Sequence, residues 1–175
     1  MPQKISRTKF FFYSNILISK GVGIYLDLFN VNKSLNKRFS TIAGYPNQKS
    51  LVNFLNENNH KFLGYISREM KSKLFLDNDC IIFTSPNEGS PLILLEAMAS
   101  GVFILSSNVG FIPELLGKKY PFMCKPNVND FSNLIYKYLS LSEDERYEII
   151  FNQRKRYLNL FAHKKWSEKV NLIFE

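Results

Sequence analysis

The sequence is poor in the residues that build metal sites and disulfide frameworks. It has two cysteines and two histidines among 175 residues. Cys80 and Cys124 are far apart and lie in apolar stretches, so we expect both to be reduced core residues of a cytosolic protein. No CxxC pair occurs, and His60 and His163 have no cysteine or carboxylate at ligand spacing. The sequence therefore predicts no protein-bound metal.

Long apolar runs and glycine-rich loops are scarce as well. No stretch approaches the roughly 20 uncharged apolar residues that cross a bilayer. The apolar run after the basic N-terminal residues is too short for a signal peptide, so any membrane contact would be peripheral. The only Gly-x-Gly, at residues 21–23, lacks the third glycine and the later acidic residue of a dinucleotide site. An NAD-type dehydrogenase domain is therefore disfavoured.

Negative charge is in deficit, and the formal net charge is +8. Such a balance is compatible with an anionic partner such as a nucleotide, a nucleic acid or an acidic lipid. The lysines and arginines are scattered rather than blocked, which favours a solvated basic surface. Nucleic-acid binding has no recognisable motif here, so we expect no nucleic-acid partner.

Short apolar runs alternate with amphipathic segments along the chain. The expected strands occupy residues 9–13, 39–43, 60–63, 80–84, 102–106 and 122–124. The expected helices occupy residues 21–31, 48–58, 67–76, 91–100, 112–116, 131–139, 143–159 and 166–174. This alternation, with strands apolar on both faces, predicts an α/β fold whose parallel sheet is covered on both sides.

Several residues give these helices their expected ends and faces. Ser67 is expected to cap the helix at 67–76, and Gly101 to end the helix at 91–100. Helical spacing places Ile24, Leu28 and Val31 on one face of the helix at 21–31.

The loops at the carboxyl ends of the strands are the places where an open parallel sheet binds ligands. These loops span residues 14–20, 44–47, 64–67, 85–90 and 107–111. The loop at 85–90 leads into a helix N-terminus, which carries free N–H groups and partial positive charge, so we expect a phosphate or diphosphate there. Gly89 leaves room for a ligand at the backbone, and Pro91 in the first helical turn gives up no needed N–H.

Two carboxylates, Glu88 and Glu96, lie on either side of this expected phosphate-binding position. Glu96 is about 9 Å along the helix from Ser90. Because like charges repel, we expect them to accept hydrogen bonds from hydroxyls on either side of a diphosphate. Glu88 would take sugar hydroxyls and Glu96 the ribose diol. Two alternatives stay open. Glu88 would also stabilise a helix N-terminus without any ligand, and Glu96 would also be explained by an ion pair with a lysine or arginine elsewhere.

Residues 88–101, E-G-S-P-L-I-L-L-E-A-M-A-S-G, resemble the E-x7-E segment of retaining GT-B glycosyltransferases of group 1, also called GT4. The family's usual pattern is E-G-F-[GP]-x-x-x-L-E-A-[MA]-A-x-G. Residues 11–22, 62–70, 106–116 and 157–174 resemble further family segments in the same order, the last including a Phe161/Trp166 pairing. The resemblance implies a Rossmann-like three-layer αβα sandwich with a parallel sheet of about six strands, which is one half of a GT-B fold.

The resemblance also bears on domain organisation. It implies that residues 1–175 form a single nucleotide-sugar-binding domain closed by helices within 156–175. The N-terminal acceptor domain of the family is absent from it. An excised domain, a truncated gene product and one subunit of a split enzyme all fit. The apolar surface of the closing helices predicts a partner acceptor-domain chain or a homodimer.

Roles follow from the resemblance residue by residue. Lys20 corresponds to the lysine that contacts the donor diphosphate, and Asn15 stands where many members carry an arginine. Glu88 corresponds to the acid on the transferred sugar and Glu96 to the acid on the ribose, so Lys20 and Glu88 are the expected catalytic residues. The other expected donor-binding positions are Gly21, Tyr65, Ile66, Gly89, Ser90, Pro91 and Leu92. Since proline cannot donate, the N–H groups of Ser90 and Leu92 are the expected donors in this turn.

The implied reaction is hexosyl transfer from a UDP- or GDP-linked sugar to a hydroxyl of a glycan or lipid-linked acceptor, with retention. Polysaccharide or lipopolysaccharide biosynthesis is the usual setting of the family. The resemblance implies no metal or other cofactor, and residues 77–79 (Asp-Asn-Asp) fit a turn at the opposite end of the sheet. The expected location is cytoplasmic, with peripheral contact at the inner face of the membrane. The alternative is a non-catalytic nucleotide-sugar-binding or interaction module.

Overall fold

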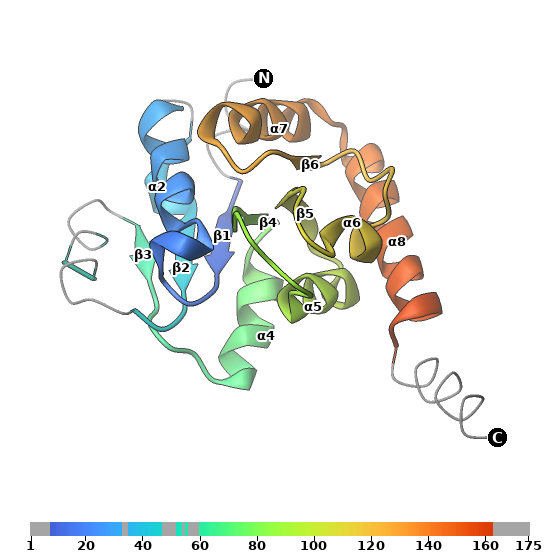
Figure 1. The fold of residues 1–175 in the computed structure, drawn as a ribbon, viewed down its shortest axis with the longest axis horizontal. Coiled ribbons are helices and arrows are strands. Elements are labelled where there is room, and N and C mark those ends of the chain that lie inside the picture. The colour runs from blue at the N-terminus through green and yellow to red at the C-terminus, as the bar shows by residue number, and fades with distance from the viewer. Residues whose placement is uncertain (1–7, 33–34, 47–51, 54, 56–59, 163–175) are drawn as a thin grey trace.

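A computed structural model describes residues 8–32, 35–46, 52–53, 55 and 60–162. Six parallel strands form one sheet in the order β3-β2-β1-β4-β5-β6 (Figure 1). The strands are β1 (Phe10–Tyr13), β2 (Ser40–Ala43), β3 (Lys61–Phe62), β4 (Cys80–Phe83), β5 (Phe103–Ser107) and β6 (Met123–Cys124). The predicted parallel α/β sheet is confirmed.

The helices are η1 (Ile18–Lys20), α2 (Val22–Val31), η2 (Lys37–Phe39), α4 (Arg68–Asp77), α5 (Leu92–Ser100), α6 (Ile112–Leu116), α7 (Val128–Ser140) and α8 (Glu143–Leu160). Most of the helices lie between successive strands, as the alternation predicts, and α7 and α8 follow the last strand. Of the helix predicted at 48–58, the structure describes residues 52, 53 and 55, which are helical. The helix predicted at 166–174 lies outside the described residues. No described helix is both long and apolar enough to cross a bilayer.

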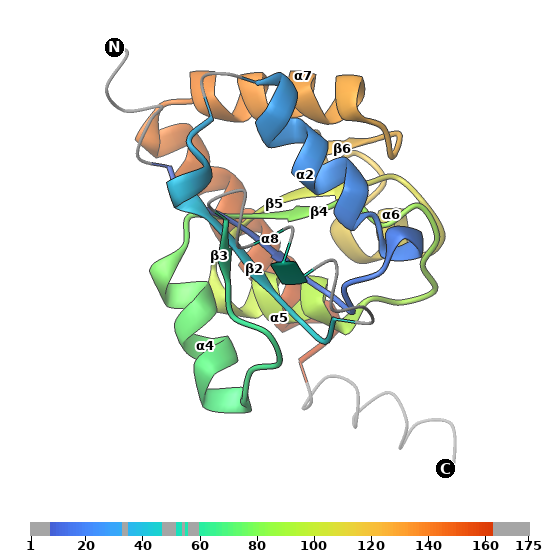
Figure 2. The ribbon, with the colours of Figure 1, turned by 90° about the vertical axis from the view of Figure 1, so that its left-hand side faces the viewer.

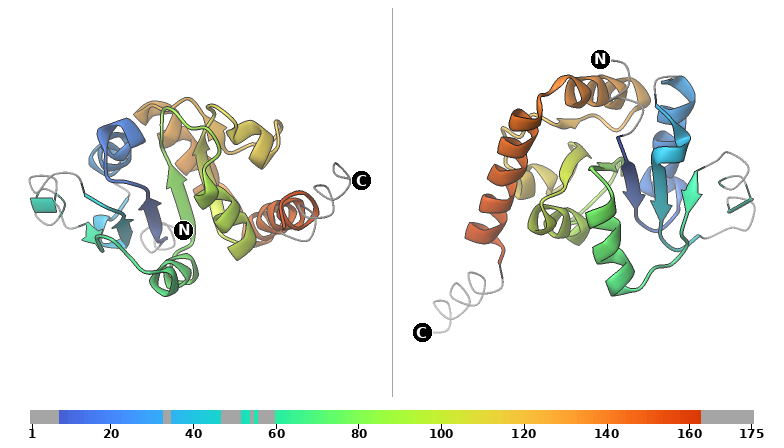
Figure 3. Two further views of the ribbon diagram at one scale, coloured as in Figure 1. Left: turned by 60° about the horizontal axis from the view of Figure 1, so that its bottom comes forward. Right: turned by 180° about the vertical axis from the view of Figure 1, so that it is seen from behind.

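Three layers result from this arrangement. Helices α2 and α7 cover one face of the sheet, while α4 and α5 cover the other (Figures 1 and 2). Helix α8 lies alongside α5, as the two views of Figure 3 also show. The Rossmann-like αβα sandwich expected for this chain is therefore present.

The aromatic run of β1 shows why the sheet needs helices on both faces. Phe10 and Phe11 are at most 1% exposed. Because successive strand side chains point to opposite faces, Phe10 meets Phe29 of α2 and Tyr138 of α7 edge-on, while Phe11 meets Phe75 of α4. Burial of each ring contributes about 1.5–3 kcal/mol to the stability of the fold. Both rings are buried only because helices cover both faces of the sheet.

Capping residues set the helix ends much as the sequence predicts. Ser67 Oγ accepts a hydrogen bond from the Met70 N–H at 3.3 Å and caps α4. Gly101, with φ of 72°, ends α5. A capping box begins α8: Ser142 Oγ accepts from the Glu145 N–H, and Glu145 Oε2 accepts from the Ser142 N–H at 2.7 Å. These bonds satisfy N–H groups that a helix start leaves unpaired.

Two local details differ from the sequence prediction. Helical spacing placed Val31 on one face of α2 with Ile24 and Leu28, but Leu28 is fully buried whereas Val31 is 59% exposed. The buried stripe of α2 begins at Val22 and continues through Phe29 at helical spacing, which turns Val31 outward. The helix predicted from Pro91 begins at Leu92 instead, because Pro91 has an extended ψ of 107° and is the N-cap. Other boundaries differ from prediction by a few residues at their ends.

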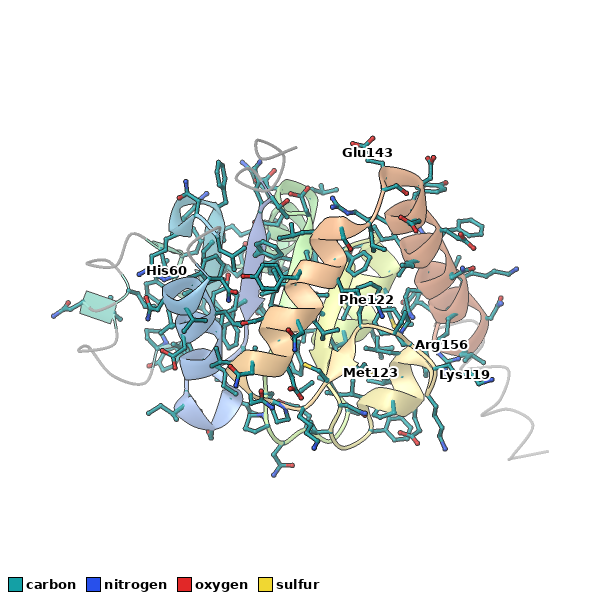
Figure 4. The ribbon with its side chains drawn as sticks, turned by 90° about the horizontal axis from the view of Figure 1, so that it is seen from above. His60, Lys119, Phe122, Met123, Glu143 and Arg156 are labelled. Atoms are coloured by element: carbon teal, nitrogen blue, oxygen red, sulfur yellow. The ribbon has the colours of Figure 1, made fainter. Side chains whose placement is uncertain are left out.

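Side chains of α8 hold the short helix α6 in place. Arg156 reaches from α8 to α6 (Figure 4) and donates from Nη2 to the Glu114 carbonyl and from Nε to the Leu115 carbonyl, both at 2.7 Å. Gln153 Nε2 donates to the Leu116 carbonyl at 3.0 Å. These bonds satisfy carbonyls that the end of a helix leaves open, and so fix the segment after β5.

The cysteines and the described histidine are packed within the fold. Both cysteines are unpaired, and burial raises the pKa of Cys80 well above its usual value and that of Cys124 to about 12. His60 is buried with Nδ1 2.8 Å from Ser40 Oγ, and this burial lowers its pKa to about 4. Among the described residues no three Cys, His, Asp or Glu side chains are grouped as metal ligands; His163 lies outside them.

Candidate functional site

The candidate site lies at the carboxyl end of the sheet, where the strand order reverses. Strands β1 and β4 are neighbours at the centre, and the chain leaves them toward β2 on one side and β5 on the other. The loops after two such strands diverge and leave a crevice. Lys20 lies in the connection after β1, and Glu88 in the connection after β4. Two of the loops predicted to bind a ligand therefore meet.

Lys20 and Glu88 form an ion pair across this crevice. Lys20 Nζ donates to Glu88 Oε1 at 2.8 Å, and their side chains are 32% and 12% exposed. Lys20 is placed by η1, which closes with the Gly21 N–H donating to the Ile18 carbonyl at 2.9 Å. The two residues expected to be catalytic are thus in direct contact, joined by a charge-assisted hydrogen bond.

Gly21 holds the Lys20 turn against the end of β4. Its φ of 82° is in the left-handed region, and a Cβ there would lie 2.3 Å from the Thr84 carbonyl oxygen. Thr84 Oγ1 also donates to the Gly21 carbonyl at 2.7 Å. Only glycine fits such a close backbone approach, so Gly21 serves the site by packing its turn.

The loop after β5 packs against the backbone of the loop that carries Glu88. Gly110 has φ of 53°, and a Cβ there would lie 1.7 Å from the Glu88 carbonyl oxygen. The next residue, Phe111, donates its N–H to the Gly89 carbonyl at 3.2 Å. The segment at 106–116 therefore acts by supporting the loop that carries Glu88.

A cavity of about 470 Å³ surrounds the Lys20–Glu88 pair. The predicted residues that line it are Asn15, Lys20, Tyr65, Glu88 and Pro91. Tyr13, Ser14 and Tyr45 also line it. Ser14 and Tyr45 lie in the predicted ligand loops 14–20 and 44–47, whereas Tyr13 was expected only as the last residue of a strand. The first turn of α5 opens on this cavity, because Pro91 and Ile93 are part of its wall. The free N–H groups of that turn supply partial positive charge beside Lys20.

A second cavity, of about 500 Å³, contains Glu96. Lys71 Nζ donates to Glu96 Oε1 at 2.5 Å, and the side chains are 24% and 39% exposed. Glu96 is thus ion-paired, which was the open alternative, and its carboxylate still lines the cavity. Tyr13 and Tyr65 line both cavities, so the cavities adjoin. Lys20, Glu88 and Glu96 therefore face one continuous region of the surface.

The remaining predicted residues are placed less directly. Ile66 is 3% exposed and belongs to the hydrophobic core at the edge of the second cavity. Gly89 and Ser90 are exposed in the loop before α5, and the Leu92 side chain is 69% exposed. The side chains of Ser90 and Leu92 do not line either cavity. The proposed contribution of Gly89, Ser90 and Leu92 is therefore through the backbone of the turn that leads into α5.

A third cavity of similar size, about 520 Å³, lies at the amino end of the strands. Asp79, Glu143 and Arg146 line it, so it carries charges of both signs. Parallel α/β sheets bind ligands at the carboxyl ends of their strands. We therefore assign the site to the two adjoining cavities.

Sequence reasoning missed Tyr13 and Lys71. Tyr13 ends an apolar strand and so resembles a core residue in the sequence. Lys71 lies one turn after the cap Ser67, whose carbonyl accepts its N–H at 2.9 Å. The spacing shows that Lys71 lies on the same side of α4 as Ser67, but it does not show what this side faces. The packing of α4 against α5 brings Lys71 to Glu96.

Comparisons with known proteins show the family to which the chain belongs. Residues 3–156 match the family model described as glycosyl transferases group 1. The alpha-1,3/1,6-mannosyltransferase ALG2 of Dictyostelium discoideum is 28% identical over 118 residues, which are 67% of this chain. The chain spans only 28% of the length of that relative.

Solved structures share the fold at low sequence identity. HepE of Anabaena, solved in complex with UDP, gives a TM-score of 0.78 at 18% identity, over 99% of this chain and 50% of HepE. The C-terminal domain of a group 1 glycosyl transferase (LpcC) from Francisella tularensis gives 0.73 at 16% identity, over 90% of this chain and 88% of that domain. With the family model matching most of its length, the chain belongs to the group 1 glycosyl transferase family.

Proposed function

We propose that this chain is the donor-binding domain of a retaining GT4 glycosyltransferase, and that a nucleotide diphosphate sugar occupies the two adjoining cavities. The observation that carries the proposal is the Lys20–Glu88 contact of 2.8 Å across the strand-order reversal. A cation, a carboxylate and a helix N-terminus converge there on one cavity. The UDP complex of HepE, which shares the fold, supports a nucleotide ligand.

The diphosphate is proposed to lie between Lys20 and the first turn of α5. The ammonium and the N–H groups of Ser90 and Leu92, the expected donors, meet its negative charge together with the Ile93 N–H in the first turn of α5. Lys20 has three N–H donors, so it can bind a phosphate oxygen while keeping its bond to Glu88. Glu88 then accepts hydrogen bonds from hydroxyls of the transferred sugar. Asn15, which also lines this cavity, donates through its amide.

The nucleoside is proposed to lie in the second cavity. Glu96 Oε1 is bonded to Lys71, while Oε2 can accept from a ribose hydroxyl. Tyr65 is 77% exposed and lines both cavities, so its ring can cover the nucleoside. The ligand thus runs from the sugar at Glu88 to the base beyond Glu96.

The proposed reaction is front-face hexosyl transfer to an acceptor hydroxyl with retention, in which a leaving-phosphate oxygen helps to deprotonate that hydroxyl. The residues of this chain position the donor and stabilise charge on the diphosphate. No metal is needed in this scheme, because Lys20 and α5 meet that charge.

The acceptor and the cellular setting are part of the proposal. The acceptor is a glycan or lipid-linked hydroxyl of polysaccharide or lipopolysaccharide biosynthesis. It is presented by an acceptor-domain chain or a second copy, at the cytoplasmic face of a membrane.

A thermal-shift panel tests donor binding. The 175-residue chain is heated with UDP, GDP, UDP-glucose or GDP-mannose. A ligand at 100 times its Kd should stabilise the chain by about 2.7 kcal/mol. Glu96→Gln should lose most of the shift, whereas Glu148→Gln, a matched change at an exposed position of α8, should keep it. No shift with any of these ligands would overturn the proposal.

A further inference from the structure

We propose that Lys71 reads the base of the nucleotide. Its ammonium, anchored at Glu96 beside the ring of Tyr13, donates a hydrogen bond to a carbonyl oxygen of the base. The site would then favour bases with a carbonyl over adenine. This inference rests on the proposed function, because it requires a nucleoside diphosphate in the two adjoining cavities.

The placement of Lys71 makes it a fixed feature of the second cavity. Its Nζ is 2.5 Å from Glu96 Oε1 and 5.8 Å from the centroid of the Tyr13 ring. The two contacts come from different elements, α5 and β1. They hold a long side chain in one orientation before any ligand arrives, so binding costs little further side-chain entropy.

The order of charges along the crevice assigns the base to this end. Lys20 and the first turn of α5 border the first cavity and meet a diphosphate there. Tyr13 and Tyr65 border both cavities. A nucleotide whose phosphates lie at Lys20 therefore extends its nucleoside past these rings toward Lys71.

The proposed orientation of the donor decides which part of the ligand reaches Lys71. In that orientation Glu96 accepts from the ribose, and Lys71 Nζ lies 2.5 Å from Glu96 Oε1. The part of the ligand beside Lys71 is therefore the base attached to that ribose. Lys71 has three N–H donors, one of which is bonded to Glu96, and its side chain is 24% exposed at the cavity.

The bases differ in what they offer to this donor. Uracil and guanine carry carbonyl oxygens, whereas adenine has none. A site built to hydrogen-bond a ligand group discriminates against an analogue without it, because the donor is left unpaired. Arg68 also lines the cavity but is exposed, so we assign base reading to the anchored ammonium.

Isothermal titration calorimetry with UDP, GDP and ADP, which measures the Kd of each nucleotide, tests the inference. The unaltered chain should bind at least one of UDP and GDP about tenfold or more tighter than ADP. Lys71→Met should reduce that ratio to within about threefold, while Lys71→Arg, which keeps the charge beside Glu96, should retain part of it. Lys73→Met makes the same change on the same helix at an exposed position outside this cavity, and should leave the ratio unaltered.

The outcomes separate this inference from the proposed function. Equal binding of all three nucleotides to the unaltered chain, or an equal loss for all three in Lys71→Met, would overturn base reading by Lys71 and leave donor binding intact. The second result would mean that Lys71 only positions Glu96. Binding of none of the three would instead overturn the proposed function, and with it the inference.

Discussion

The ammonium of Lys20 lies 2.8 Å from a carboxylate oxygen of Glu88, although 68 positions of sequence separate the two residues. The contact joins the loops on either side of the strand-order reversal. Both residues were expected to meet different parts of one donor. In the structure each side chain is the partner of the other.

A double-mutant cycle should measure this contact. Lys20→Met, Glu88→Gln and the double variant should give a coupling of about 1 kcal/mol in the free energy of unfolding, because a partly buried charged hydrogen bond is stronger than an exposed one. Urea denaturation at low and high salt measures it. The Glu114–Lys118 pair, exposed and 3.7 Å apart, is the control and should couple by at most about 0.5 kcal/mol. Equal coupling energies in the two cycles would show that burial does not strengthen the Lys20–Glu88 ion pair.

Gly110→Ala should damage the support of Glu88. The left-handed φ and the overlap of a Cβ with the Glu88 carbonyl predict a loss of about 2–4 kcal/mol in the free energy of unfolding. Gly23→Ala is the control. Its Cβ would have no neighbour within 4 Å, and in α2 it should stabilise by about 0.5–1 kcal/mol. Similar thermal unfolding of Gly110→Ala and the unaltered chain would show that the loop adapts.

Thr84→Val should loosen the turn that carries Lys20. Loss of the hydrogen bond from Thr84 Oγ1 to the Gly21 carbonyl should lower the free energy of unfolding by only about 1 kcal/mol. The loss is small because the carbonyl keeps a second hydrogen bond, from the Tyr25 N–H at 3.1 Å. Amide hydrogen exchange at Lys20 and Gly21 should become faster. Thr84→Ser keeps the hydroxyl and should preserve slow exchange; faster exchange in that variant would assign the effect to packing.

Stability should depend on pH through His60. Its pKa is lowered from 6.5 to about 4 in the folded chain, by burial first and by the Lys37 charge second. As pH falls below 6.5, the unfolded chain takes up a proton that the folded chain resists. Stability is therefore lost between about pH 6.5 and pH 4, with a slope of at most about 1.4 kcal/mol per pH unit.

Thermal unfolding across this pH range, compared with His60→Gln, isolates the effect of His60. Gln keeps a polar partner for Ser40 Oγ, which lies 2.8 Å from His60 Nδ1, and does not titrate. The difference between the two chains should be constant above about pH 6.5 and should change below it. A difference that stays constant down to pH 4 would mean that His60 titrates normally.

The sequence by itself determined the class of fold and predicted the loops in which the candidate site lies. Runs such as 80–83, apolar at every position, require cover on both faces and so a parallel sheet between helices. The cap at Ser67 and the glycine stop at Gly101 depend on local chemistry, and both formed as predicted. The loops at the carboxyl ends follow from the same alternation, because parallel strands direct those ends to one edge.

Only the tertiary structure decided which loops meet and which charges pair. Strand order depends on pairing between distant segments, so nothing local indicated that β1 lies beside β4 and brings Lys20 to Glu88. The Lys71–Glu96 pair and the approach of Gly110 to Glu88 depend in the same way on how α4 packs against α5 and how the loop after β5 folds back. Short-range periodicity describes the faces of single elements, whereas the packing of one element against another selects the face that lines the site.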